Sequence, residues 1–108
     1  MDTTIEKVGE LTIVTVKQES LDARSARDFR DDIDAVITDG SKVLLDMQNV
    51  QFVDSSGLGT IVASLKRLRS TGGELSICCV HSTVRALFEL VRMHRLVEIF
   101  DTREEALR

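Results

Sequence analysis

The sequence contains no proline, tryptophan or tyrosine, and only two cysteines and four phenylalanines in 108 residues. The absence of proline excludes a proline-rich linker, so we expect short connections set by glycine and polar caps. No apolar run approaches the roughly 20 residues that span a bilayer, and the first residues lack the basic segment and apolar core of a secretory signal. We therefore expect one domain over residues 1–108 that is soluble, cytoplasmic and not attached to a membrane.

The two cysteines, Cys78 and Cys79, are adjacent within an apolar run. Adjacent cysteines are poorly placed for a disulfide, and two thiols are too few for a metal site. We expect both thiols to be buried structural groups, and we expect no metal and no cofactor.

Positive charge is also scarce, because the formal net charge is −4 and the one small basic cluster is Lys66, Arg67 and Arg69. This cluster lies on the polar side of a predicted helix. The four phenylalanines all lie within apolar patterns, which does not suit a platform for stacked bases. The composition therefore argues against a nucleic-acid partner.

What the sequence does contain is a succession of strand-like and helix-like segments. Short segments that are apolar or that mix apolar with polar residues predict strands over residues 4–8, 11–16, 42–47, 75–80 and 96–100. Apolar residues three and four positions apart predict helices over 23–37 and 57–70 and from about 82, and a capping box predicts a short helix after Thr102.

The first two predicted strands flank Gly9-Glu10 and indicate an antiparallel hairpin. The later strands alternate with helices, which is typical of parallel strand pairing. We therefore predict an α/β fold, with a mixed, largely parallel β-sheet packed with about four helices.

The polar turn Asp54-Ser55-Ser56-Gly57 joins the central strand to the following helix. The first N–H groups of a helix have no partner within it, so a side-chain oxygen can cap them and negative charge is favoured there. One of the two serine hydroxyls is therefore expected at the helix start, where a phosphate group would have a large effect.

Residues 52–59, Phe-Val-Asp-Ser-Ser-Gly-Leu-Gly, followed by Gly-Gly-Glu-Leu at 72–75, resemble the signature of STAS-domain anti-sigma factor antagonists. The length and element order are also similar, so the resemblance covers nearly the whole chain. It implies a partner switch that is not an enzyme. The unphosphorylated protein would bind an anti-sigma factor that is also a serine kinase, which then releases its target. Phosphorylation by that kinase would abolish binding, and a metal-dependent Ser/Thr phosphatase would restore it.

Residue by residue, the resemblance implies that Ser55 is the phosphoacceptor. The implied partner-binding residues are Asp22, Asp54, Ser55, Ser56, Gly57 and Leu58. The family commonly has a Gly-Glu-Leu-Asp turn before its first helix, and this sequence has Glu19-Ser20-Leu21-Asp22 there. Asp22 is therefore expected beside the serine site, on a rim whose shape and charge differ from the usual ones.

Three other functions compete with the switch. A serine hydrolase would use Ser55 or Ser56 with His81 or His94, but the turn is not Gly-x-Ser-x-Gly and no third group orients a histidine. A nucleotide-binding domain would need a phosphate-binding loop, and that pattern is absent.

The third alternative is a STAS scaffold or adaptor subunit of a transport or signalling complex that does not switch. In such a protein the serine after Asp54 would serve only as a helix cap. Within the switch itself, the sequence leaves open whether the released target is a sigma factor or another effector. We expect a monomer.

Overall fold

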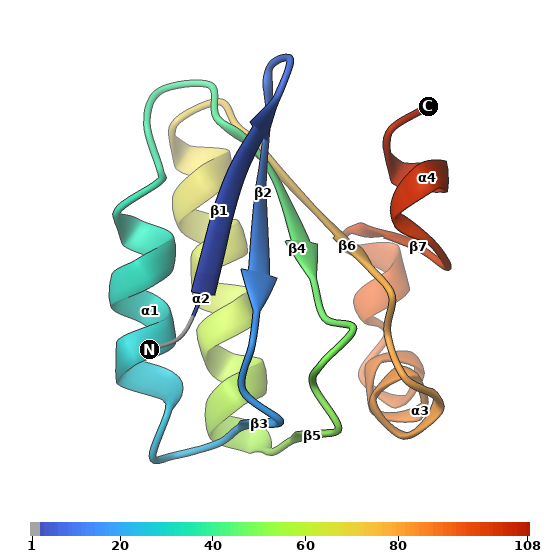
Figure 1. Cartoon of the computed structure of the whole chain (residues 1–108). Coiled ribbons are helices and arrows are strands. Elements are labelled where there is room, and N and C mark those ends of the chain that lie inside the picture. Colours follow the sequence, from blue (N-terminus) through green and yellow to red (C-terminus); the bar gives the residue numbers. More distant parts are fainter. Residues whose placement is uncertain (1–2) are drawn as a thin grey trace.

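The computed structural model describes residues 3–108 (Figure 1). The strands are β1 (Thr3–Val8), β2 (Leu11–Val16), β3 (Ser20–Leu21), β4 (Lys42–Asp46), β5 (Phe52–Val53), β6 (Glu74–Cys78) and β7 (Glu98–Phe100). The helices are α1 (Ala26–Asp34), α2 (Ser55–Ser70), α3 (Ser82–Leu90) and α4 (Arg103–Ala106), with a 3-10 turn η1 (Met93–Arg95).

The central sheet has the strand order β1-β2-β4-β6-β7 in the described part of the chain. β1 and β2 form an antiparallel hairpin, whereas β2, β4, β6 and β7 pair in parallel. The hairpin turns at Gly9, where a φ of 61° favours glycine. The predicted α/β class, with a mixed, largely parallel sheet and four helices, is therefore confirmed.

The alternation of side chains along the strands gives the sheet two apolar faces. On the larger face, residues such as Val14, Leu45 and Ile77 pack against Phe29 of α1, Ile61 of α2 and Phe88 of α3. The smaller face holds a second cluster of Ile13, Leu44 and Cys78, with Phe100 and Ala106 packed on it.

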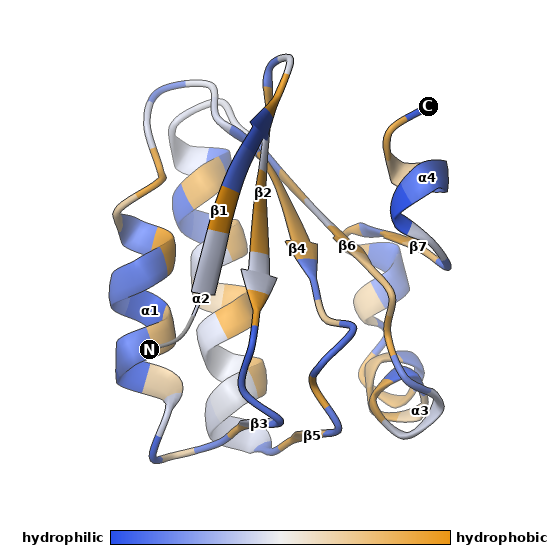
Figure 2. Ribbon diagram, viewed as in Figure 1, coloured by the Kyte–Doolittle hydropathy of each residue, from blue (hydrophilic) through white to orange (hydrophobic). Residues whose placement is uncertain are grey.

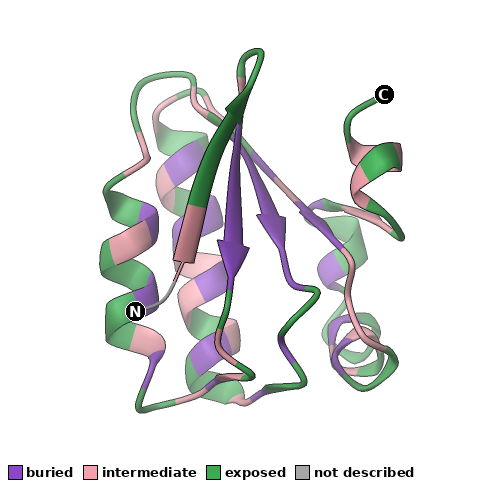
Figure 3. Ribbon diagram, viewed as in Figure 1, coloured by how far each residue is buried: buried purple, intermediate pink, exposed green. Residues whose placement is uncertain are grey.

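The sheet is most apolar and most buried at its centre. Hydrophobic residues concentrate along β2 and β4 (Figure 2), and the same two strands are buried whereas most of β1 is exposed (Figure 3). The nearly continuous apolar run of β4 predicted this continuous burial, whereas in β2 the polar residues Thr12 and Thr15 are buried as well. In residues 3–108, no helix has the length and apolar character needed to cross a bilayer.

Several predicted boundaries were wrong. The helix predicted over 23–37 is observed only over Ala26–Asp34, because Val36 and Ile37 leave the helix yet still pack against the core. The strand predicted over 75–80 ends at Cys78, since Cys79 has a φ of 63°.

The sequence also failed to predict β3 and β5. They form a small parallel pair in which Ser20 is opposite Phe52 and Leu21 is opposite Val53. This pair lies at the edge of the fold where β4 and β6 end, next to the starts of α2 and α3 (Figure 1). The carboxyl ends of parallel strands are a common place for binding sites in α/β proteins.

Candidate functional site

Asp54 is the N-cap residue of α2. Its backbone is extended, and its Oδ1 atom accepts a hydrogen bond from the backbone N–H of Gly57 at 3.0 Å. A carboxylate in this position also interacts favourably with the helix dipole. The side-chain oxygen that caps the helix is therefore that of Asp54 and not a serine hydroxyl.

Ser55 and Ser56 are the first two residues of α2, and both are exposed. In the part of the chain that the structure describes, neither hydroxyl makes a hydrogen bond, and the Ser56 carbonyl accepts one from the Thr60 hydroxyl at 3.0 Å. Since Asp54 already caps the helix, the two hydroxyls have no structural task. They are accessible to another protein.

Gly57 brings the start of α2 into close contact with β3. A Cβ atom on Gly57 would lie 2.2 Å from the Leu21 carbonyl oxygen, and the same oxygen accepts a hydrogen bond from the Asp54 N–H at 3.1 Å. Gly57 is buried and Leu58 is half-buried against the main core. Both residues therefore shape the site mainly from beneath, and Asp22 follows directly after the contact at Leu21.

Asp22 organises the turn between β3 and α1. Its Oδ1 atom accepts hydrogen bonds from the backbone N–H groups of Arg24 at 3.0 Å and Ser25 at 3.3 Å. Partial desolvation acts to raise the pKa of Asp22, but these N–H groups and the Arg24 guanidinium outweigh it and lower the pKa. The carboxylate is thus charged at neutral pH, one residue after Leu21, whose carbonyl oxygen contacts the start of α2.

An open polar cavity of about 590 Å³ borders this turn. It is lined by Lys17, Gln18, Glu19, Ser20, Asp22, Arg24, Ser25 and Asp28. The lining carries charges of both signs, so the rim next to the serine site is polar rather than strongly acidic.

The histidines considered for a hydrolase are not placed to activate a serine. The Nε2 atom of His81 lies against the Gln48 carbonyl oxygen and the Gln51 side chain, and His94 belongs to η1. Within residues 3–108 neither histidine hydrogen-bonds to a serine of the α2 turn. This arrangement offers no Ser-His pair.

The structure adds a third group to the two cysteines. Ligand atoms of Asp46, Cys78 and Cys79 lie within 4.8 Å of one another, a cluster that sequence spacing alone did not reveal. Burial raises the pKa of both thiols, and the Asp46 charge acts in the same direction. Asp46 is already paired with Arg103 through bonds of 3.0 and 3.1 Å. Protonated thiols and a neighbouring guanidinium make this a poor cation site.

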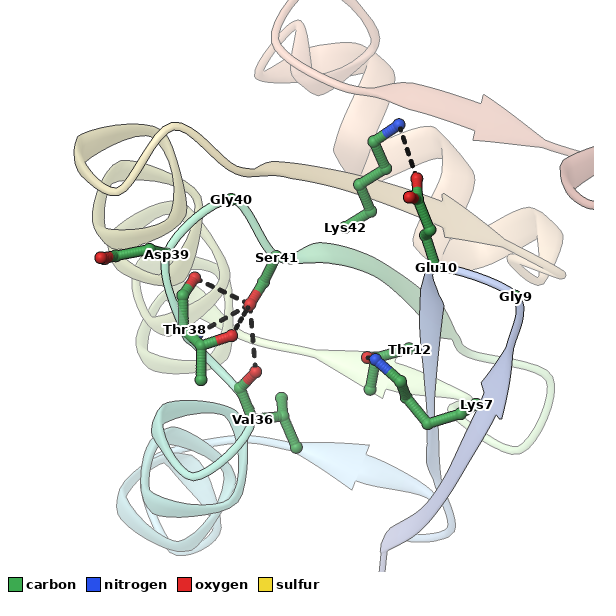
Figure 4. A pocket seen from close by; sticks show the side chains of 10 residues that line it. All are labelled: Lys7, Gly9, Glu10, Thr12, Val36, Thr38, Asp39, Gly40, Ser41 and Lys42. Atoms are coloured by element: carbon green, nitrogen blue, oxygen red, sulfur yellow. Dashed lines mark hydrogen bonds and ion pairs between the residues drawn. The ribbon is translucent and has the colours of Figure 1, made fainter.

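Another cavity, also of about 590 Å³, lies at the opposite end of the sheet, around the β1–β2 turn (Figure 4). Its two lysines have partners: Lys42 is paired with Glu10 at 3.9 Å, and Lys7 donates a hydrogen bond to the Thr12 hydroxyl. None of the predicted partner-binding residues lines it. The α2 start is therefore the candidate site.

With the fold and the serine turn at the start of α2 described, the chain can be compared with known proteins. The model of the STAS domain family matches residues 2–106. The chain belongs to the STAS domain family. This STAS protein is 35% identical over 65 residues to the anti-sigma F factor antagonist of Paenibacillus polymyxa, an alignment that covers 60% of this chain and 56% of that protein.

A second relative covers much more of the STAS protein. A candidate anti-sigma factor antagonist of Thermotoga neapolitana is 30% identical over 103 residues, which are 94% of this chain and 91% of that protein. The family expected from the serine motif, that of the anti-sigma factor antagonists, is thus confirmed.

Solved structures share the fold. An anti-sigma-factor antagonist (STAS) domain protein from Planctomyces limnophilus superposes with a TM-score of 0.89 at 20% identity, covering 99% of this chain and 96% of that one. The Bacillus cell fate determinant SpoIIAA, solved in its phosphorylated form, gives 0.73 at 22% identity, covering 98% and 96%. At these identities the likeness concerns the fold alone.

Proposed function

We propose that this STAS protein is an anti-sigma factor antagonist that acts as a phosphorylation-controlled partner switch, with residues 1–108 working as one monomeric cytoplasmic domain. Its unphosphorylated form binds an anti-sigma factor that is also a serine kinase, and that partner releases its target, a sigma factor or another effector. The observation that carries the proposal is the exposed Ser55 hydroxyl, which makes no hydrogen bond in the described residues at a helix start that Asp54 already caps.

Phosphorylation changes the charge of this surface more than its shape. A phosphoserine adds about −1.5 to −2 charges at neutral pH and three acceptor oxygens. Placed on Ser55, the group lies at the N-terminus of the 16-residue helix α2, where the dipole and free N–H groups favour an anion. We therefore expect the fold to change little on phosphorylation.

A docked partner has no such compensation. The phosphate would stand beside the Asp54 carboxylate, near the charged Asp22, and would have to be desolvated in the interface. Each ~1.4 kcal/mol of lost binding free energy is a factor of ten in affinity, so a few kcal/mol separate the bound from the dissociated form. We propose this electrostatic expulsion as the off-step of the switch.

The rest of the cycle is performed by other proteins. The kinase adds the phosphate to Ser55, and a metal-dependent Ser/Thr phosphatase removes it, so the STAS protein needs no catalytic group, metal or cofactor of its own. The exposure of Ser55 suits access by both enzymes. Bacillus SpoIIAA, which shares this fold, has been solved in a phosphorylated form, and this supports the proposal.

The competing function is a constitutive scaffold or adaptor in a transport or signalling complex. A scaffold needs the serine only as a helix cap, and in this protein Asp54 has that role. The free hydroxyl therefore favours the switch.

A pull-down from lysate of the source organism tests the switch against the scaffold. The baits are the unmodified protein, Ser55→Ala, Ser55→Asp and the matched control Ser56→Ala, and captured proteins are identified by mass spectrometry. We expect one anti-sigma factor kinase to be retained by all forms except Ser55→Asp, and to phosphorylate Ser55 when ATP is added. Capture of the same proteins by all four baits would instead establish a constitutive adaptor.

A further inference from the structure

Phe52 is the one phenylalanine of this protein, within residues 3–108, that is mostly exposed. Its exposed fraction is 54%, whereas Phe29 and Phe88 are fully buried. The cause is local: β5 alternates, so burial of Val53 in the core turns Phe52 outward. The apolar pattern of the sequence predicted no such exposed ring.

The backbone that carries Phe52 is held on both sides. The N–H groups of Gln51 and Phe52 both donate to the Glu19 carbonyl oxygen, at 2.7 and 3.1 Å. From the other side, the Thr83 hydroxyl at the start of α3 donates to the Gln51 carbonyl oxygen at 3.2 Å. An exposed ring on a fixed backbone loses little conformational entropy when a partner covers it, which favours binding.

Phe52 also lies close to Ser55. The two positions are three apart in the sequence, and at no more than 3.6 Å per residue their Cα atoms are at most about 11 Å apart. A protein interface of standard size covers about 800 Å² on each partner, equivalent to a disc of about 16 Å radius. Since β5 and the start of α2 lie at the same edge of the fold (Figure 1), a partner centred on Ser55 extends to Phe52.

We propose that Phe52 is the apolar anchor of the surface that binds the anti-sigma factor kinase, and that the kinase offers an apolar pocket to this ring. The inference rests on the proposed function and deepens it, because it assigns affinity and control to different residues. Phe52 supplies binding through apolar burial, which is the usual role of an aromatic residue covered by a partner. Ser55 supplies the charge-dependent step.

The chain offers a matched control for the anchor. Leu90 has an exposed fraction of 80%, so it is a more exposed apolar side chain than Phe52. It is the last residue of α3, about 12 Å along the helix from the end that contacts the Phe52 loop. Truncating Leu90 removes exposed apolar surface away from the proposed anchor.

Calorimetric titration of the purified anti-sigma factor kinase tests the inference, with the wild type, Phe52→Ala, Phe52→Leu and Leu90→Ala. We expect Phe52→Ala to weaken binding between about 30- and 100-fold, which is the lower part of the range of an interface hot spot. Phe52→Leu should lose less affinity for the kinase, because an apolar side chain remains. Leu90→Ala should bind within twofold of the wild type. Unfolding midpoints of all variants should agree, since both positions are exposed.

The possible outcomes separate the inference from the proposed function. If the wild type binds the kinase, loses it on phosphorylation of Ser55, and Phe52→Ala binds equally well, the anchor is refuted while the switch stands. If Leu90→Ala weakens binding as much as Phe52→Ala, the anchor is also refuted, because the effect is not specific to the site. If the wild type does not bind the kinase, the proposed function and the inference fail together.

Discussion

The Asp54 carboxylate accepts a hydrogen bond from the Gly57 N–H at 3.0 Å, so the two intervening serines are not needed to cap the helix. Capping and the proposed phosphorylation are thus divided between neighbouring residues. Ser55 can be modified without removing a hydrogen bond on which α2 depends. This division explains how a switch can act at a helix start while the fold stays intact.

The cap itself can be tested by replacing Asp54. Asp54→Ala should lower the free energy of unfolding by about 1 kcal/mol, because it removes an N-cap side chain. Asp54→Asn should retain most of that stability, since asparagine caps as well as aspartate does. Urea unfolding measures both. Equal losses in the two variants would mean that charge, not the hydrogen bond, stabilises the helix start.

Two glycines of α2 should respond oppositely to alanine. A Cβ on Gly57 meets the Leu21 carbonyl oxygen at 2.2 Å, so Gly57→Ala should cost about 1–3 kcal/mol of stability by forcing β3 away from the helix. Gly59 has no atom within 4 Å of the added Cβ, so Gly59→Ala should gain about 0.5–1 kcal/mol. Thermal or urea unfolding checks the pair, and similar effects at both sites would contradict the close contact.

Arg103 is predicted to hold the C-terminal helix to the sheet. It bonds Asp46, which is 1% exposed, and also Glu6 and the Thr15 hydroxyl. Arg103→Met should cost about 3 kcal/mol, because it leaves the Asp46 charge buried without its partner.

Arg85→Met is the control for Arg103, since it breaks a pair with Asp101 of similar length whose side chains are 34% and 74% exposed. The free energy of unfolding of this variant should fall by less than about 1 kcal/mol. Urea unfolding of both variants makes the comparison. A loss at Arg103 no larger than that at Arg85 would show that the buried pair does not stabilise the fold.

The contribution of the Asp22 carboxylate to the stability of the protein should depend on pH. Desolvation acts to raise the pKa of Asp22, but the N–H groups of Arg24 and Ser25 lower it below the usual 3.8. A carboxylate with a lowered folded pKa stabilises the protein above the unfolded pKa, and that contribution is lost as the pH falls through the folded pKa. An NMR titration of the Asp22 carboxyl carbon should therefore give a midpoint below 3.8. A midpoint at or above 3.8 would argue against the hydrogen-bonded turn.

The sequence predicted the sheet well because its central strands contain nearly continuous apolar runs such as that of Lys42–Asp46, whose burial depends little on distant residues. It overextended α1 because Val36 and Ile37 keep the helical spacing after the helix has ended at Asp34. Periodicity records which residues face the core, and a loop can bury the same residues.

The sequence predicted which residues form the site, but it did not predict how they are arranged in space. That Asp54 would cap α2, and not a serine, depends on the extended backbone before the helix. The pairing of β3 with β5 joins residues about thirty positions apart, as Ser20 and Phe52 show, and two-residue strands carry no periodic signal. The exposure of Phe52 follows from that pairing, so it too was hidden from sequence patterns.

The most direct test is the affinity of the purified anti-sigma factor kinase for the STAS protein with and without a phosphate on Ser55. Titration calorimetry should show tight binding of the unmodified protein and binding weaker by at least about 100-fold after phosphorylation, a loss of about 2.7 kcal/mol. Equal Kd values for the two forms would contradict the switch and identify the protein as a constitutive binding module.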